Sequence, residues 1–167
     1  MVSILTDMKY AGYMPNDFID GEGICVSFWV QGCPFHCPGC HNPEGWDFNG
    51  GYDVPLDIKG RIVKAISANG IQRNFSILGG EPLCESNKEL VYNVLTAVRA
   101  AYPNIKVFLW TGYTYEELLE QKDETINNIL KNVDTLIDGR YIESERDITL
   151  KLRGSKNQRV IDLTEKI

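Results

Sequence analysis

The sequence contains no long hydrophobic run and no excess of positive charge. None of its apolar stretches approaches the roughly 20 residues that a helix needs to cross a bilayer. The net charge is −6, from 17 basic and 23 acidic residues, which argues against non-specific binding to nucleic acid or to an anionic membrane. The first nine residues lack a charged segment followed by an apolar core, so we expect a cytoplasmic protein without an export signal.

The chain also lacks internal repeats, low-complexity tracts and interdomain linkers. Its 167 residues suit one domain, and a chain of this length buries about 70% of its unfolded surface. The hydrophobic fraction of 43% and the charged fraction of 24% are ordinary for a globular protein. We therefore expect a single domain over residues 1–167.

Three of the five cysteines lie close together, at Cys33, Cys37 and Cys40, in the spacing C-x3-C-x2-C. An odd number of cysteines without an export signal argues against a disulfide framework, and clustered thiols in a cytosolic protein are typical of metal ligands. Thiolates at this spacing bind iron–sulfur clusters or zinc. Three cysteines would leave one iron of a four-iron cluster without a protein ligand, and a catalytic metal site requires such an open position.

Zinc remains an alternative at this point. His36 or His41 could join the three cysteines as a fourth ligand, which would give a small structural zinc site in a non-enzymatic interaction module. The other two cysteines, Cys25 and Cys84, are expected to be core residues, because free cysteine is commonly buried.

Apolar runs that end in polar or glycine-rich loops alternate with helical patterns along the chain. The continuous apolar character of the first run, Cys25–Gln31, indicates a strand buried on both faces, as in a parallel sheet. Residues 1–24 are expected to form a loop, and residues 148–162 short strands. Ser86 with Glu89, and Thr114 with Glu117, predict capping boxes. Further strands are expected at 74–78, 106–110 and 133–137, and helices at 54–68, 86–102, 114–120 and 124–130.

This alternation predicts an α/β fold with a mostly parallel sheet and crossover helices. Ligands of such sheets bind at the carboxyl ends of the strands, where the cysteine loop and the loop Gly79-Gly80-Glu81-Pro82 both lie. The paired glycines either form a simple strand-to-helix turn or let the backbone approach a ligand closely. Glu81 could accept hydrogen bonds from an ammonium group. The amino acid end of S-adenosylmethionine carries such a group, and its amine and carboxylate could bind an iron that has an open position.

The cysteine motif followed by Gly-Gly-Glu-Pro resembles the radical S-adenosylmethionine superfamily. Further stretches are similar to the family that activates anaerobic ribonucleoside-triphosphate reductase, and together they cover nearly the whole chain. The sequence departs from the pattern in having His41 where the family frequently has tyrosine, and Glu81 where some relatives have aspartate. Gly39, before the third cysteine, is often found in this narrower family. The stretches that carry the resemblance are residues 17–23, 32–40, 110–113, 133–139 and 153–158.

The resemblance implies that Cys33, Cys37 and Cys40 hold a 4Fe–4S cluster whose fourth iron binds the amine and carboxylate of S-adenosylmethionine. One electron would then cleave S-adenosylmethionine to methionine and a 5′-deoxyadenosyl radical, which would abstract a hydrogen from a glycine of the reductase. This chemistry demands no protein acid or base, so no catalytic side chain is expected. Contacts to S-adenosylmethionine are expected from Gly39, Cys40, His41, Gly79, Gly80, Glu81, Trp110, Thr111 and Asp138.

The same resemblance implies a single radical S-adenosylmethionine domain over residues 1–167, folded as a partial TIM-like β/α barrel. The chain has too few strand–helix units to close a barrel, so we expect the glycine loop of the reductase to close the site. The expected partners are the reductase and a one-electron donor such as flavodoxin. The alternatives are another radical S-adenosylmethionine enzyme, either a different glycyl-radical activase or a deazaguanine-synthase-like enzyme, and the zinc module.

Overall fold

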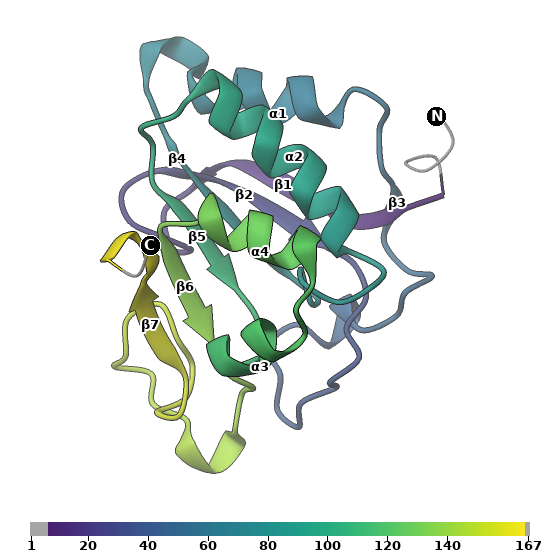
Figure 1. Ribbon diagram of the computed structural model, residues 1–167, viewed down its shortest axis with the longest axis vertical. Coiled ribbons are helices and arrows are strands. Elements are labelled where there is room, and N and C mark those ends of the chain that lie inside the picture. Colours follow the sequence, from purple (N-terminus) through teal and green to yellow (C-terminus); the bar gives the residue numbers. More distant parts are fainter. Residues whose placement is uncertain (1–6, 166–167) are drawn as a thin grey trace.

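Strands of one mixed sheet form the centre of the computed structural model, which describes residues 7–165 (Figure 1). Across the sheet their order is β3-β1-β2-β4-β5-β6-β7. The strands are β1 (Lys9–Asp17), β2 (Cys25–Val30), β3 (Tyr52–Asp53), β4 (Asn74–Gly79), β5 (Val107–Trp110), β6 (Thr135–Asp138) and β7 (Arg159–Asp162). The α-helices are α1 (Ile58–Ile66), α2 (Lys88–Ala101), α3 (Tyr115–Glu120) and α4 (Glu124–Lys131). No helix among the described residues is long and apolar enough to cross a membrane.

The central strands β2, β4, β5 and β6 are parallel neighbours, as their continuous apolar sequences predicted. Antiparallel strands flank them, with β1 and β3 on one side and β7 on the other. The α/β class is therefore confirmed. The sheet is open, since β3 and β7 lie at its opposite edges, and the expected partial barrel is not confirmed.

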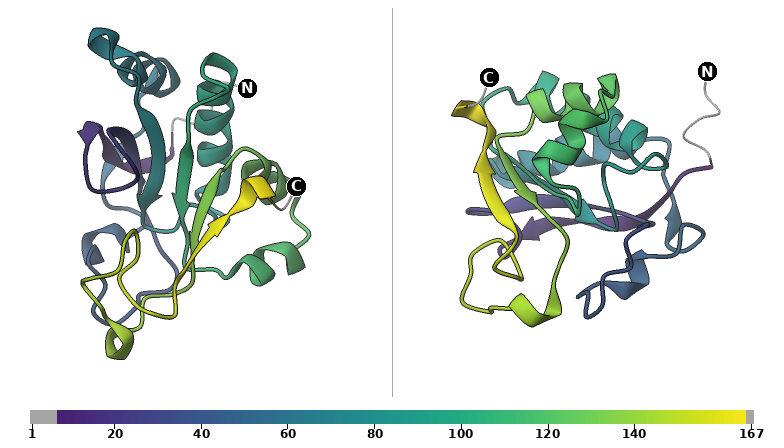
Figure 2. Two further views of the ribbon diagram at one scale, coloured as in Figure 1. Left: turned by 90° about the vertical axis from the view of Figure 1, so that its left-hand side faces the viewer. Right: turned by 60° about the horizontal axis from the view of Figure 1, so that its bottom comes forward.

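The two faces of the sheet have different coverings. Alternate residues such as Val26, Phe28 and Ile77 point into the hydrophobic core under α1, α2 and α4. Residues at the other positions, including Ser27, Trp29, Ser76, Leu78, Phe108 and Trp110, belong to the opposite face. Figure 2 shows the α-helices on one side of the sheet, and loops with short 3-10 helices on the other. That second face is where a ligand can reach the strand ends.

Several local predictions were wrong for identifiable reasons. Residues 9–17 form β1 rather than a loop, and the register with β2 shifts after Tyr10 and after Met14, which hides the alternating pattern. The helix expected from residue 54 begins only at Ile58, and the Val54 N–H pairs instead with the Met8 carbonyl, next to β1. The next helix, α2, begins after Asn87, so Ser86 is not its cap.

The capping box at the start of α3 is confirmed. The Thr114 side chain accepts a hydrogen bond from the Glu117 N–H, and the Glu117 carboxylate accepts one from the Thr114 N–H. These two bonds satisfy backbone donors that a helix cannot satisfy itself.

A buried arginine joins the end of α1 to β1. Arg73 is 4% exposed, and its guanidinium donates to the carbonyls of Ala65, Ala68 and Ile71 and to the Asn16 side chain at 2.8–3.1 Å. These bonds satisfy the carbonyls that remain free where the helix ends.

We predict that Arg73→Met lowers the free energy of unfolding by about 3 kcal/mol, because it leaves several buried carbonyls without donors. Urea denaturation followed by circular dichroism measures the change. Arg61→Met is the control, since Arg61 makes only a surface ion pair with Asp57 and should cost less than about 1 kcal/mol. Equal losses in the two variants would contradict this role for Arg73.

Candidate functional site

The cysteine loop leaves the carboxyl end of β2 and is held by backbone hydrogen bonds. The Gly32 N–H donates to the Gly45 carbonyl at 2.7 Å, and the Cys33 N–H donates to the Trp46 carbonyl at 3.2 Å. The amide of Gln31, which is 4% exposed, donates to two further carbonyls of this neighbouring segment at 2.8 Å. The position of the loop is therefore set by the segment that follows it.

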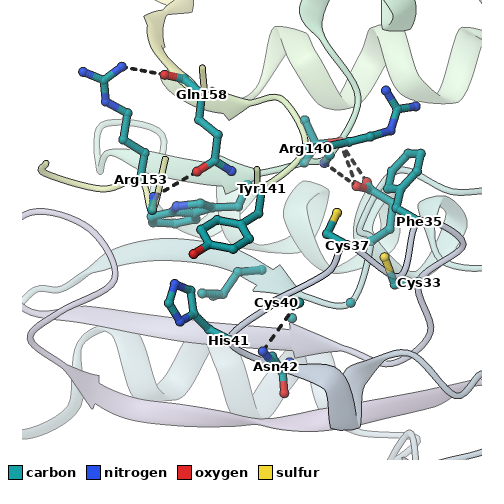
Figure 3. Close-up of a pocket in the computed structure, with 18 of the residues that line it drawn as sticks. Cys33, Phe35, Cys37, Cys40, His41, Asn42, Arg140, Tyr141, Arg153 and Gln158 are labelled. Carbon is teal, nitrogen blue, oxygen red and sulfur yellow. Dashed lines mark hydrogen bonds between the residues drawn. The ribbon is translucent and has the colours of Figure 1, made fainter. Parts of the chain in front are cut away.

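Cys33, Cys37 and Cys40 are all partly exposed and line one cavity of about 440 Å³ (Figure 3). Burial raises the pKa of the Cys33 and Cys37 thiols, while nearby backbone N–H groups lower it. The Cys40 sulfur accepts a hydrogen bond from the Asn42 N–H at 3.4 Å. The three thiols are soft donors that line the same cavity, although no three His, Cys, Asp or Glu side chains among the described residues are arranged around a single metal ion. Coordination to a metal would remove the thiol protons.

The paired glycines of the loop after β4 serve the packing of the chain itself. A Cβ atom on Gly79 would lie 2.5 Å from the Val30 carbonyl oxygen, and one on Gly80 would lie 2.2 Å from the Gly32 carbonyl oxygen. Gly79 also has a φ of 114°, which side chains rarely permit. Both glycines line the cavity, so this close packing also forms part of its wall.

Glu81 is 1% exposed and its carboxylate is fully engaged by the chain's own donors. It accepts hydrogen bonds from the N–H groups of Leu83 at 2.7 Å and Gly112 at 2.6 Å, and from the Thr111 hydroxyl at 2.9 and 3.0 Å. Burial raises its pKa to about 7, although these hydrogen bonds oppose the shift. The carboxylate therefore ties the loop after β4 to the loop after β5.

The remaining predicted contact residues fall into two groups. His41, Trp110 and Thr111 line the cavity together with the cysteines, and the Trp110 indole N–H donates to the Leu152 carbonyl at 2.6 Å. Gly39 and Asp138 are not among the lining residues. Asp138 is 1% exposed, pairs with Arg159, and accepts a hydrogen bond from the Tyr115 N–H at 2.7 Å.

The other cysteines and His36 occupy structural positions. Cys25 is fully buried in β2 and Cys84 is 5% exposed, so the prediction that both belong to the core is confirmed. His36 is exposed, and its ring stacks on Trp46 with centroids 4.8 Å apart.

Sequence reasoning missed several lining residues. Tyr141 faces His41, with ring centroids 5.2 Å apart, and Arg153 and Gln158 come from the end of the chain (Figure 3). In the sequence, the stretch 153–158 carries part of the family resemblance and no other signal. Its place beside the cysteines depends on long-range packing. Two polar atoms of the lining residues, Tyr141 Oη and Trp46 Nε1, are buried without a hydrogen-bond partner among the described residues. Such atoms indicate where a ligand's polar groups can bind.

A pair of carboxyl groups lies beside the cavity, where Asp20 contributes to the lining. Asp17 is 3% exposed, and its carboxyl group lies beside the Asp20 carboxyl and the Ser27 hydroxyl. Burial and the Asp17 carboxyl raise the pKa of Asp20 to about 7. Burial also acts on Asp17, but the N–H groups of Asp20 and Ile19 hold its pKa below the usual value.

Comparison with known proteins gives consistent results along the chain. Residues 19–161 match the family model described as a 4Fe-4S single cluster domain. A Vibrio cholerae protein named anaerobic ribonucleoside-triphosphate reductase-activating protein is 32% identical over 152 residues, 90% of this chain and 96% of that protein. Proteins of the same name from phage T4 and Escherichia coli K12 are 34% and 31% identical, over 95% and 90% of this chain and 96% of each relative.

We predict that stability falls as the pH rises through the range in which Asp20 titrates. The folded protein keeps the Asp20 proton up to about pH 7. The unfolded chain loses it near about pH 4, so the free energy of unfolding decreases between these values. The contribution of Asp17, whose pKa is lowered, is already complete above about pH 4 and does not change in this interval.

Asp20→Asn should lower the change in the free energy of unfolding over this pH range by about 1–2 kcal/mol. This value takes account of the partial exposure of the site, which weakens the effect of burial. Urea denaturation at about pH 5 and about pH 8 measures it. Asp53→Asn, at an exposed carboxylate paired with Lys9, should keep the wild-type profile. An unchanged slope in Asp20→Asn would show that Asp20 does not carry the proton.

Proposed function

This chain belongs to the family of anaerobic ribonucleoside-triphosphate reductase-activating proteins, and on this basis we propose that it generates a glycyl radical on that reductase. The proposal rests on one observation, which is that three cysteines and the loops at four strand ends line the same cavity. The activity would make the protein an oxidoreductase that uses S-adenosylmethionine.

The residues present fit a 4Fe–4S cluster with one open iron. Cys33, Cys37 and Cys40 would hold it, because their thiols line the same cavity and no other cysteine lies on its wall. When bound and reduced, the cluster supplies the electron that cleaves S-adenosylmethionine. The chain's part is to hold the thiols in place through the bonds from Gly32 and Cys33, and to donate the Asn42 N–H to the Cys40 sulfur.

The cavity also fits S-adenosylmethionine. The unpaired Tyr141 Oη and Trp46 Nε1 offer hydrogen bonds to a polar ligand, and His41 lies beside Tyr141. Backbone atoms of Gly79 and Gly80 form the opposite wall. We propose that the other predicted contact residues serve the same cofactor. Glu81 and Thr111 act mainly by positioning the loops, and Trp110 fixes the part of the wall that it lines. The proposal extends to Gly39, Cys40 and Asp138 as neighbours of the site.

We further propose that residues 1–167 act as one radical S-adenosylmethionine domain whose open sheet corresponds to part of a barrel. The face without helices would then be closed by the glycine loop of the reductase. A one-electron donor such as flavodoxin would reduce the cluster in the cytoplasm, and neither nucleic acid nor a membrane would take part. The acidic net charge of −6 is consistent with this set of partners.

The decisive experiment is anaerobic reconstitution with iron and sulfide, followed by dithionite and S-adenosylmethionine. We expect the wild-type protein to turn brown and to form 5′-deoxyadenosine, and we expect a glycyl radical signal in electron paramagnetic resonance when the reductase is added. Cys37→Ala should lose at least about a hundredfold in deoxyadenosine, since one cluster ligand is missing.

Cys84→Ala is the matched control, because Cys84 is a buried cysteine that does not line the cavity. It should retain the brown colour and most of the deoxyadenosine. A colourless wild-type protein that binds one zinc ion and makes no deoxyadenosine would refute the proposed function.

A further inference from the structure

The three most exposed large hydrophobic side chains of the described residues belong to two segments, residues 17–22 and 146–155, that contribute lining residues to the cysteine cavity and that we call its mouth. Ile19 and Ile148 are each 84% exposed and Phe18 is 71% exposed, ahead of every other large apolar side chain in the described part. Ile19 lines the cavity itself. Single exposed apolar residues are common, but a group of them around one opening marks an interaction site.

Ile148 belongs to the second of these segments, a hairpin formed by residues 146–155. Arg146 and Ser155 pair as a β-bridge, and the Asp147 N–H donates to the Gly154 carbonyl at 3.0 Å. Leu150 and Leu152 of the hairpin line the cavity, and Trp110 holds it to the end of β5 through the Leu152 carbonyl. Ile148 does not line the cavity itself, but it belongs to this fixed hairpin and lies two residues before the lining residue Leu150.

The two segments of the mouth differ in charge. Residues 148–160 contain four basic side chains and no acidic one, on a chain whose net charge is −6. Arg159 is paired with Asp138 and Glu116, whereas Lys151 and Lys156 are exposed and take part in no ion pair found among the described residues. The segment at residues 17–22 carries little net charge, since Asp17 is buried, Asp20 keeps its proton up to about pH 7, and Glu22 pairs with Lys106.

We propose that this mouth is the docking surface for an extended segment of the substrate reductase. Apolar side chains of that segment pack on Phe18, Ile19 and Ile148, and an acidic side chain lies against Lys151 and Lys156. The inference rests on the proposed function, in which the reacting glycine belongs to a polypeptide that must reach the cysteine cavity. The apolar edges continue directly into that cavity, so a bound segment would also exclude water from it.

The test compares the affinity of reconstituted wild-type and variant proteins for the anaerobic reductase by biolayer interferometry. We expect the double variant Phe18→Asp/Ile148→Asp to raise the dissociation constant about tenfold or more, because two apolar anchors are replaced by charges. Leu56→Asp is the matched control, since Leu56 is 67% exposed but lies away from the cavity. It should bind within about twofold of the wild type.

A second pair of measurements tests the charged edge. The wild-type affinity should fall as sodium chloride rises from about 50 to about 300 mM, and Lys151→Glu/Lys156→Glu should weaken binding and remove most of this dependence. Control substitutions Lys59→Glu/Lys64→Glu on α1 should leave the salt dependence unchanged.

The outcomes separate the docking surface from the proposed function. If Phe18→Asp/Ile148→Asp binds the reductase as tightly as Leu56→Asp does, the proposed docking surface is wrong. This holds whether or not the protein forms deoxyadenosine. Deoxyadenosine formation by the wild-type protein without the reductase is measured in parallel, and it reports the proposed function alone. A wild-type protein that binds the reductase through this mouth but makes no deoxyadenosine would overturn the function and leave the surface standing.

Discussion

The backbone contact between the loops after β2 and β4 is the constraint on which the site depends. The Gly80 N–H donates to the Val30 carbonyl at 3.0 Å, and the Glu81 N–H donates to the Gly32 carbonyl at 2.8 Å. These bonds extend the parallel ladder beyond the ends of the strands, and only residues without a Cβ can come so close. The cysteine loop is consequently fixed relative to the sheet before any ligand binds, which is the pre-organisation that a catalytic centre requires.

The two faces of the sheet have different roles, and this difference follows from the same geometry. Helices bury the apolar face and provide the core, so the fold does not depend on the other face for its stability. The loop-covered face can therefore keep polar and aromatic residues such as Ser76 and Trp110. Glu81 then joins two of its loops through a buried carboxylate, and a tight cluster of donors makes that burial tolerable.

The parallel strands, the capping box at Thr114 and the position of the cysteine loop could be predicted from the sequence, because each has a local pattern. Strand β1 could not, since its register shifts break the alternation that marks a strand. The paired glycines gave an ambiguous signal, and only the neighbouring Val30 and Gly32 show why they are needed. Tyr141 and the hairpin at 146–155 reach the cavity through long-range contacts that no short motif encodes.

The hairpin also has a consequence for the order in which the protein is made. The three cysteines leave the ribosome before Tyr141, Leu152 and Gly154, which also line the cavity and follow Cys40 by more than 100 residues. At about 5–20 residues per second, the nascent chain presents three uncovered thiols for on the order of ten seconds. Insertion of a cluster before the wall is complete would leave it open to solvent and oxidants. A cluster loaded after the hairpin has folded would instead lie in a cavity that Tyr141 and Leu152 already line.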